Sequence, residues 1–146
     1  MKKENIIEEK SFNFSLKIIE LYKLLINEKK YILSKQLLRA GTSIGANVNE
    51  SISAVSRRDF INKLSISLNE ARETKYWLRL HEESDLTKIN VNAVLIDVEE
   101  IIRILTSIIK SSNKIYNFFS LILNSLFLIF NFYFLILNYH FLISNF

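Results

Sequence analysis

The stretch that decides the fold is Leu33–Leu80, LSKQLLRAGTSIGANVNESISAVSRRDFINKLSISLNEARETKYWLRL. Apolar residues recur in it at steps of three and four, the spacing of a helix that lies on a core. This pattern is interrupted at residues 53–56, so the stretch predicts two long helices joined by a short turn. It also contains both glycines and the only tryptophan of the chain.

The composition divides the chain into two parts. Among 146 residues there are two glycines and no proline, so little interrupts helix formation, and the absence of cysteine excludes disulfides and thiol chemistry. The net charge of +4 is concentrated in residues 31–80, whereas residues 115–146 contain no Asp, Glu, Lys or Arg. We therefore expect a charged amphipathic body at 1–114 and a low-complexity apolar tail at 115–146.

The body contains four amphipathic segments. The helices that we expect cover residues 5–28, 32–52, 57–80 and 91–110. Capping-box spacing marks two of their starts, at Asn5 with Glu8 and at Ser56 with Asp59. Four amphipathic helices with short connections bury their apolar stripes in an antiparallel up-down four-helix bundle. The expected fold is therefore all-α, with an apolar C-terminal extension.

The second helix carries a candidate contact surface between copies of the chain. Gly41 and Gly45 share one helix face, and each glycine costs about 1 kcal/mol of helix stability relative to alanine, which suggests that another backbone approaches closely there. A polar stripe lies beside them and is either a solvated face or part of a subunit contact. On the second interpretation, the candidate oligomer interface consists of Arg39, Gly41, Ser43, Gly45, Asn47 and Glu50.

The third helix carries a candidate nucleic-acid contact. The residues of this candidate contact are Arg58, Arg72, Lys75 and Arg79. Such a row can meet phosphate groups, although an ordinary solvated face, balanced by Glu70 and Glu73, has the same pattern. His81 falls in an expected solvated turn and lacks the partners that a structural zinc needs. We therefore expect no metal, no cofactor, no catalytic residues and no small-molecule substrate.

The body also resembles a known family. The runs SKQLLRAGTSIGANVNE and RRDFINKLSISLNEARETKYWLRL, together with SFNFSLKIIELY and LTSIIKSSN, resemble the four-helix bundle proteins encoded by intervening sequences of 23S ribosomal RNA. Arg39-Ala40, Asn47 and Trp77-Leu78 are among the matching residues. The resemblance covers roughly residues 5–114, and it departs from the family in a glycine-free turn at 51–56 and in the tail.

The resemblance implies a cytoplasmic bacterial protein without enzymatic activity. Members assemble into ring-shaped homo-oligomers, usually pentamers, so the chain itself is an expected partner. A related branch resembles the accessory protein of diversity-generating retroelements, whose basic surface partners a reverse transcriptase and nucleic acid. RNA or DNA is therefore a second expected partner, and the charged N-terminal run MKKENIIEEKS, which lacks a signal-peptide apolar region, agrees with a cytoplasmic location.

The tail repeats every seven residues and leaves two interpretations open. Isoleucine and asparagine both recur at this step, for example at Ile115, Ile122 and Ile129. The segment 118–137 is long and apolar enough for a membrane anchor, and Lys110 and Lys114 precede it. The chain would then be a membrane-tethered protein-interaction scaffold. Alternatively, the tail is the translation of a T-rich tandem nucleotide repeat, since all its residue types can be encoded by AT-rich codons.

Overall fold

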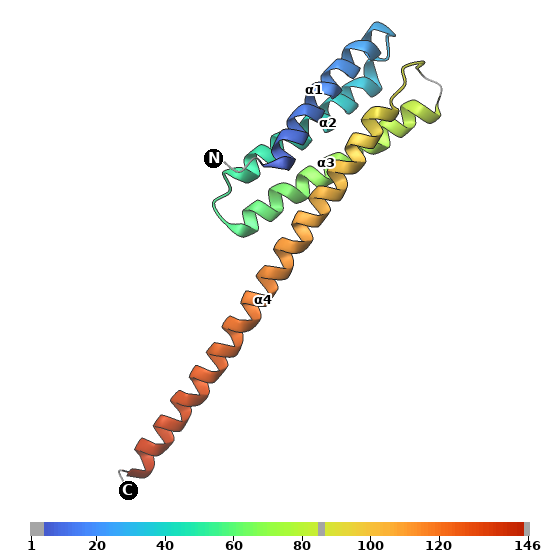
Figure 1. Ribbon diagram of the computed structural model, residues 1–146. Coiled ribbons are helices and arrows are strands. Elements are labelled where there is room, and N and C mark those ends of the chain that lie inside the picture. Colours follow the sequence, from blue (N-terminus) through green and yellow to red (C-terminus); the bar gives the residue numbers. More distant parts are fainter. Residues whose placement is uncertain (1–4, 85–86, 145–146) are drawn as a thin grey trace. The chain divides into compact units, whose positions relative to one another are not determined.

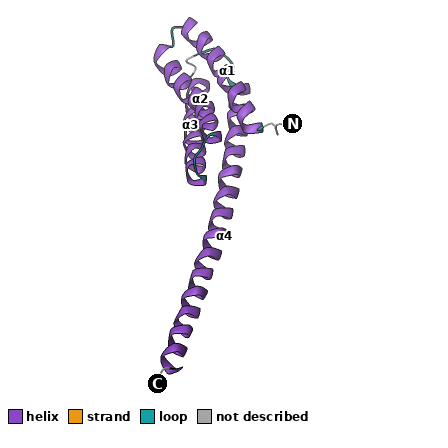
Figure 2. Cartoon of the chain, turned by 90° about the vertical axis from the view of Figure 1, so that its left-hand side faces the viewer, coloured by secondary structure: helices purple, strands orange, loops and turns teal. Residues whose placement is uncertain are grey.

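The computed structural model describes residues 5–84 and 87–144, with side chains described as far as residue 136. Its elements are α1 (Ile6–Asn27), α2 (Tyr31–Ile52), α3 (Arg57–Glu83) and α4 (Asn92–Ser144). All elements of the described part of the chain are helices (Figures 1 and 2), which confirms the expected all-α class. The chain divides into two compact units, Met1–Ile109 and Lys110–Phe146.

Contacts within the first unit give the direction of each helix. Early α1 faces late α2, since Ser11 lies beside Gly45 and Ile18 beside Gly41. The same opposite order relates α2 to α3. It also relates α1 to α4, where Lys10 pairs with Glu100 and Lys17 with Asp97. Successive helices therefore run antiparallel, as expected for an up-down four-helix bundle.

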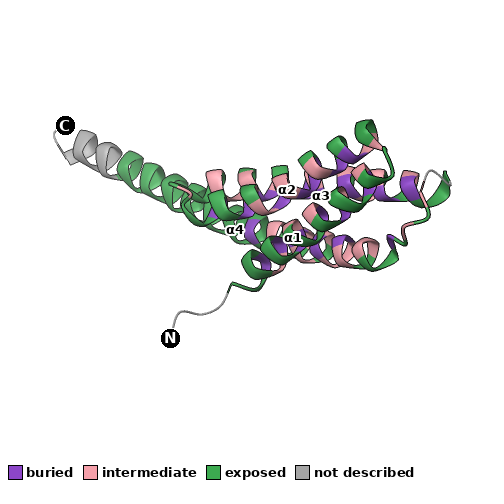
Figure 3. Cartoon of the chain, turned by 90° about the horizontal axis from the view of Figure 1, so that it is seen from above, coloured by how far each residue is buried: buried purple, intermediate pink, exposed green. Residues whose placement is uncertain are grey.

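The core is made by one stripe from each helix (Figure 3). The buried apolar residues include Phe14, Ile18, Leu21, Leu25, Leu37, Ile44, Val48, Leu64, Leu78, Val98, Ile101 and Leu105. Most of them recur at steps of three and four, so the pattern confirms the stripes expected for all four helices. One buried polar contact joins two of these stripes, because the Ser67 hydroxyl donates to the backbone carbonyl of Ile44 at 3.0 Å. The hydroxyl is thereby satisfied inside the core.

The two glycines allow α1 to approach α2 closely. A Cβ atom on Gly41 would lie 2.7 Å from Cγ1 and 2.8 Å from Cγ2 of Ile18. A Cβ atom on Gly45 would lie 2.8 Å from the Ser15 hydroxyl oxygen and 3.1 Å from the Ser11 carbonyl oxygen. The expected close approach is therefore present, but the approaching backbone is α1 of the same chain. Because α1 of the same chain lies against both glycines, the close approach needs no second copy, and the contact between copies expected at this face stays a prediction.

The helix starts differ in how they are capped. The Ser56 hydroxyl accepts a hydrogen bond from the Asp59 backbone N–H at 3.1 Å, which confirms the cap expected for α3. Asn5 is the N-cap residue of α1 but its side chain makes no capping hydrogen bond, so the box expected with Glu8 is wrong. The φ angle of Lys29 is 61°, which turns the chain between α1 and α2.

The second unit is formed by the later part of α4. We expected the fourth helix to end near Lys110, but α4 continues to Ser144 because no proline or glycine interrupts it. Every residue from 113 to 136 is exposed (Figure 3). Most of these residues are apolar. The side chains beyond 136 lie outside the described residues, and with them the last members of the seven-residue repeat, such as Ile143.

His81 corrects the expectation of a solvated turn. Helix α3 continues through it to Glu83, and the side chain is only 1% exposed. Neither imidazole nitrogen has a hydrogen-bond partner in the described structure. Burial lowers the pKa of His81, because a charged imidazolium would be removed from water without a compensating partner.

The packing of Ile18 on Gly41 predicts the effect of adding one methyl group. In an open helix, Gly41→Ala gains about 1 kcal/mol of propensity. Here the methyl group meets two branched carbons of a fully buried side chain, and overpacking costs about 1–3 kcal/mol. We expect Gly41→Ala to lower the free energy of unfolding in urea. In a double-mutant cycle with Ile18→Ala the two effects should be non-additive, and a Gly41→Ala variant that is more stable than the parent contradicts the packing.

The burial of His81 predicts a pH dependence of stability. Its pKa in the folded chain is lowered from about 6.5, so below that pH the unfolded chain binds more protons and stability falls. We expect His81→Leu to reduce this loss between pH 7 and pH 5 in urea unfolding measured by circular dichroism. The lowered pKa values of Glu73 and Glu99 place their titration below this window. If the free energy of unfolding of His81→Leu falls with pH as steeply as that of the parent, a group other than His81 causes the loss.

Candidate nucleic-acid interface

Three of the four expected cationic residues line one groove along α3. Arg72, Lys75 and Arg79 follow each other at steps of three and four, which places them on one side of the helix. The groove measures about 320 Å³. The residues that line it are Arg72, Lys75, Tyr76, Arg79, Leu80 and Glu83. Arg58 is exposed near the start of α3 and is not among them.

Two of the groove's cations already have carboxylate partners. Lys75 Nζ lies 2.7 Å from Glu99 Oε1 on α4, and the Arg79 Nε donates to Glu83 Oε1 at 3.0 Å. The hydrogen bond from Lys75 lowers the pKa of Glu99, and the hydrogen bond to Glu83 raises the pKa of Arg79. Arg72 is exposed and pairs with no other residue in the described part of the chain. The groove therefore retains positive charge, with one guanidinium not engaged by a carboxylate.

An aromatic side chain lies among these cations. Tyr76 is 56% exposed, and its ring meets that of Trp77 edge to face at 5.2 Å between centroids. Tyr76 was not among the contact residues expected from the sequence. Its position beside Lys75 and four residues after Arg72 was the available signal, because residues four apart share a helix face. An exposed ring of this kind offers a flat apolar surface beside the positive charge.

A second hollow adjoins the groove between α3 and α4. It measures about 630 Å³. The residues that line it are Lys75, Arg79, Glu82, Asn92, Leu95, Ile96 and Glu99. Because both hollows share Lys75 and Arg79, these two cations lie at the boundary between them.

The polar stripe of α2 is occupied within the chain. Arg39 pairs with Glu73 and lies 3.6 Å from the second carboxylate of α3, Glu70, while Glu50 pairs with Lys63. The Asn47 amide donates to the backbone carbonyl of Ser43 at 2.8 Å. The stripe thus aligns α2 with α3, and its charged members have partners without a second copy.

Glu73 is the centre of this α2–α3 contact. The Trp77 indole N–H donates to Glu73 Oε1 at 3.1 Å, and Arg39 also donates to the carboxylate. The hydrogen bond from Trp77 and then that from Arg39 lower the pKa of Glu73, against the opposing effect of burial. The nearby Glu70 Oε2 atom is buried without a hydrogen bond, and Arg39 Nη1 lies 3.6 Å from it as a compensating charge.

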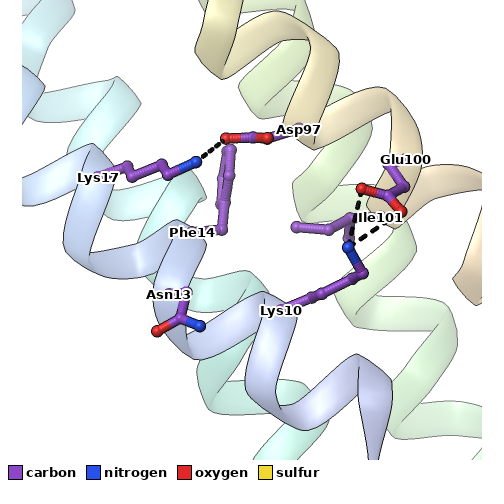
Figure 4. Close-up of a pocket in the computed structure, with 7 residues that line it drawn as sticks. All are labelled: Lys10, Asn13, Phe14, Lys17, Asp97, Glu100 and Ile101. Atoms are coloured by element: carbon purple, nitrogen blue, oxygen red, sulfur yellow. Dashed lines mark hydrogen bonds and ion pairs between the residues drawn. The ribbon is translucent and has the colours of Figure 1, made fainter.

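A smaller pocket lies between α1 and α4 (Figure 4). It measures about 180 Å³, and Phe14 and Ile101 form its apolar floor. Lys17 Nζ lies 2.6 Å from Asp97, and Lys10 Nζ lies 3.0 Å from Glu100, so each cation is matched by an anion (Figure 4). Within the described residues, no group of three or more His, Asp or Glu side chains could hold a metal ion.

Comparisons with known proteins address the family of the chain. The family model for the 23S rRNA-intervening sequence protein matches residues 3–107. A crystal structure from Bacteroides thetaiotaomicron, of a protein with unknown function from the S23 ribosomal protein family, is 49% identical with a TM-score of 0.68. The match covers 71% of this chain and 98% of that one. No curated protein matches the chain.

The family match covers the helical body. It includes the whole of α1, α2 and α3, and it ends within α4, before the apolar tail. The resemblance that was found on Arg39-Ala40, Asn47 and Trp77-Leu78 is thereby confirmed. The chain belongs to the 23S rRNA-intervening sequence protein family.

Proposed function

We propose that the bundle is a non-catalytic scaffold that binds the phosphate backbone of RNA or DNA at the α3 groove and self-assembles into a homo-oligomer. The observation that carries the nucleic-acid part is the groove lined by Arg72, Lys75 and Arg79. Phosphate contacts from such cations release counterions from the nucleic acid, which supplies affinity without sequence readout.

The ion pairs in the groove do not prevent this binding. The Arg79–Glu83 pair is exposed on both sides, and exposed pairs contribute little free energy. A phosphate oxygen can therefore replace one carboxylate of such a pair at small cost. Arg72 needs no such exchange. Tyr76 adds a ring on which an unpaired base can stack, since base–aromatic stacking is independent of sequence.

The self-assembly part of the proposal rests on a surface different from the expected one. Since α1 lies against Gly41 and Gly45, the contact between copies that we propose uses an outer surface of the bundle. Phe12 and Leu16 are 63% and 48% exposed and lie four residues apart on the side of α1 opposite its buried stripe. Two large apolar side chains on one outer face favour burial against a second copy.

Nucleic-acid binding predicts a salt dependence that the groove cations control. We expect the full chain, in a non-ionic detergent that covers the apolar tail, to bind duplex DNA with log affinity falling linearly with log salt concentration. Replacing Arg72, Lys75 and Arg79 by Ala should weaken binding at least about tenfold and reduce the slope by about 3. Fluorescence anisotropy across a salt series measures both quantities, and single-stranded RNA is titrated in parallel.

A matched control removes the same charge elsewhere. Lys17, Lys23 and Lys88 are exposed cations outside the groove, and their triple replacement by Ala should change affinity and slope much less. Equal losses in the two triple variants would show a general charge effect. Absence of binding at low salt would overturn the nucleic-acid part of the proposal.

The α1 surface predicts which substitutions change the oligomer. We expect Phe12→Glu with Leu16→Glu to lower the mass measured by light scattering in detergent, after correction for bound detergent, because charged side chains resist burial. Val55→Glu, at the 94% exposed residue of the α2–α3 turn, is the control and should leave the mass unchanged. The parent mass also tests the pentamer that the resemblance implies. A monomeric parent, or a double variant that keeps the parent mass, counts against this surface.

A further inference from the structure

The second unit exposes apolar surface around its whole circumference. From residue 113 to 136 every side chain is exposed. In 115–136 serine and asparagine occur singly among apolar residues, except where Asn124 and Ser125 are adjacent. The residues Leu123, Leu126, Phe127, Ile129, Phe130 and Tyr133 alone border a hollow of about 620 Å³ with almost no polar lining. Contiguous apolar surface of this extent marks contact with a membrane or a partner.

The length of this segment matches a bilayer. Residues 118–137 are a run of 20 in continuous helix, and at 1.5 Å per residue they extend about 30 Å, the thickness of the hydrocarbon core. One stretch, Asn92–Ile136, is long and apolar enough to cross a membrane, with a mean hydropathy of 2.0 in its most apolar window. None of that window is buried within the chain. Because the window is exposed, it is not the core helix of a soluble protein. It also lies in the fourth helix, whereas a signal sequence lies near the N-terminus.

The polar side chains of the segment are partly satisfied by their own helix. The Ser125 hydroxyl donates to the carbonyl of Ile122 at 2.8 Å, and the Asn131 amide donates to the carbonyl of Phe127 at 2.8 Å. A hydrogen bond within the helix removes much of the cost of placing a polar group in hydrocarbon. These interruptions therefore do not exclude a lipid environment, although asparagine at every seventh residue suggested otherwise from the sequence.

The flanks of the segment give an orientation. Lys110 and Lys114 precede it and Tyr116 lies at its start, which is the arrangement of cations and aromatic rings at a cytoplasmic membrane interface. No Lys or Arg follows residue 114. The bias in positive charge therefore places the end that joins α1–α3 on the cytoplasmic side.

A second copy of the tail is a poorer occupant of this surface than lipid. A coiled coil buries one seam of each helix and uses charged flanking residues to select its partner. In 115–136 the apolar residues surround the helix and no residue is charged, so pairing would leave the outer side of each helix in water. A bilayer covers all sides at once.

We propose that residues 118–137 of α4 cross a lipid bilayer as a single transmembrane helix and hold the four-helix bundle on the cytoplasmic side. The family match, which ends at residue 107, does not include this segment. The anchor would restrict assembly of the bundle to two dimensions.

Alkaline carbonate extraction of bacterial membranes tests the anchor with the full chain. We expect the parent to remain in the membrane pellet. Phe127→Lys with Phe130→Lys places two charges in the middle of the span and should shift the ratio of pelleted to soluble chain by at least about 100-fold. Phe127→Leu with Phe130→Leu is the matched control and should stay in the pellet. Parent chain in the carbonate supernatant, as a monomer or as an oligomer joined through its tails, overturns the proposal.

A separate experiment tests the orientation by labelling an introduced cysteine. The label is specific to that residue because the chain contains no cysteine of its own. A single Ser84→Cys substitution places a thiol on an exposed residue of the bundle. A membrane-impermeant maleimide should label it in disrupted cells and leave it unlabelled in intact cells whose outer membrane has been permeabilised. Labelling of the intact, permeabilised cells would place the bundle on the opposite side and overturn that part of the proposal.

Discussion

The close approach of α1 to α2 over Gly41 is the contact on which the body depends. Ile18 is fully buried, and its branched side chain occupies the space that a Cβ atom on Gly41 would fill. Because protein interiors are packed as densely as organic crystals, this contact fixes how near α1 lies to the bundle axis. The position of α1 in turn sets Lys10 and Lys17 opposite the acidic side of α4.

Ion pairs at the surface then align the helices rather than supply most of the stability. Arg39 reaches two carboxylates of α3, and Lys63 reaches Glu50 of α2. Exposed pairs contribute little free energy, but an incorrect register leaves several charges without partners. The same pairing determines which cation remains available to a ligand. The carboxylates of α2–α4 engage many of the cations but not Arg72 in the α3 groove.

The two units solve the problem of apolar surface in different ways. The body covers its apolar stripes with one another and presents charged residues to water. The later part of α4 has apolar side chains on all sides, and its residues 113–136 are all exposed. The bilayer that we propose around this segment would remove its apolar surface from water. One continuous helix would then lie in water over its first part and in lipid over its later part.

The sequence by itself determined the four helices, their buried stripes, the Ser56 cap and the family, because each depends on residues that are near one another along the chain. It also predicted that another backbone approaches the glycines, and that the cations of α3 share a side. Only the tertiary structure decided that this backbone is α1, that Lys63 pairs with Glu50 of α2, and that His81 is buried. Those outcomes depend on which helix faces which, and periodicity within one helix carries no information about its neighbour.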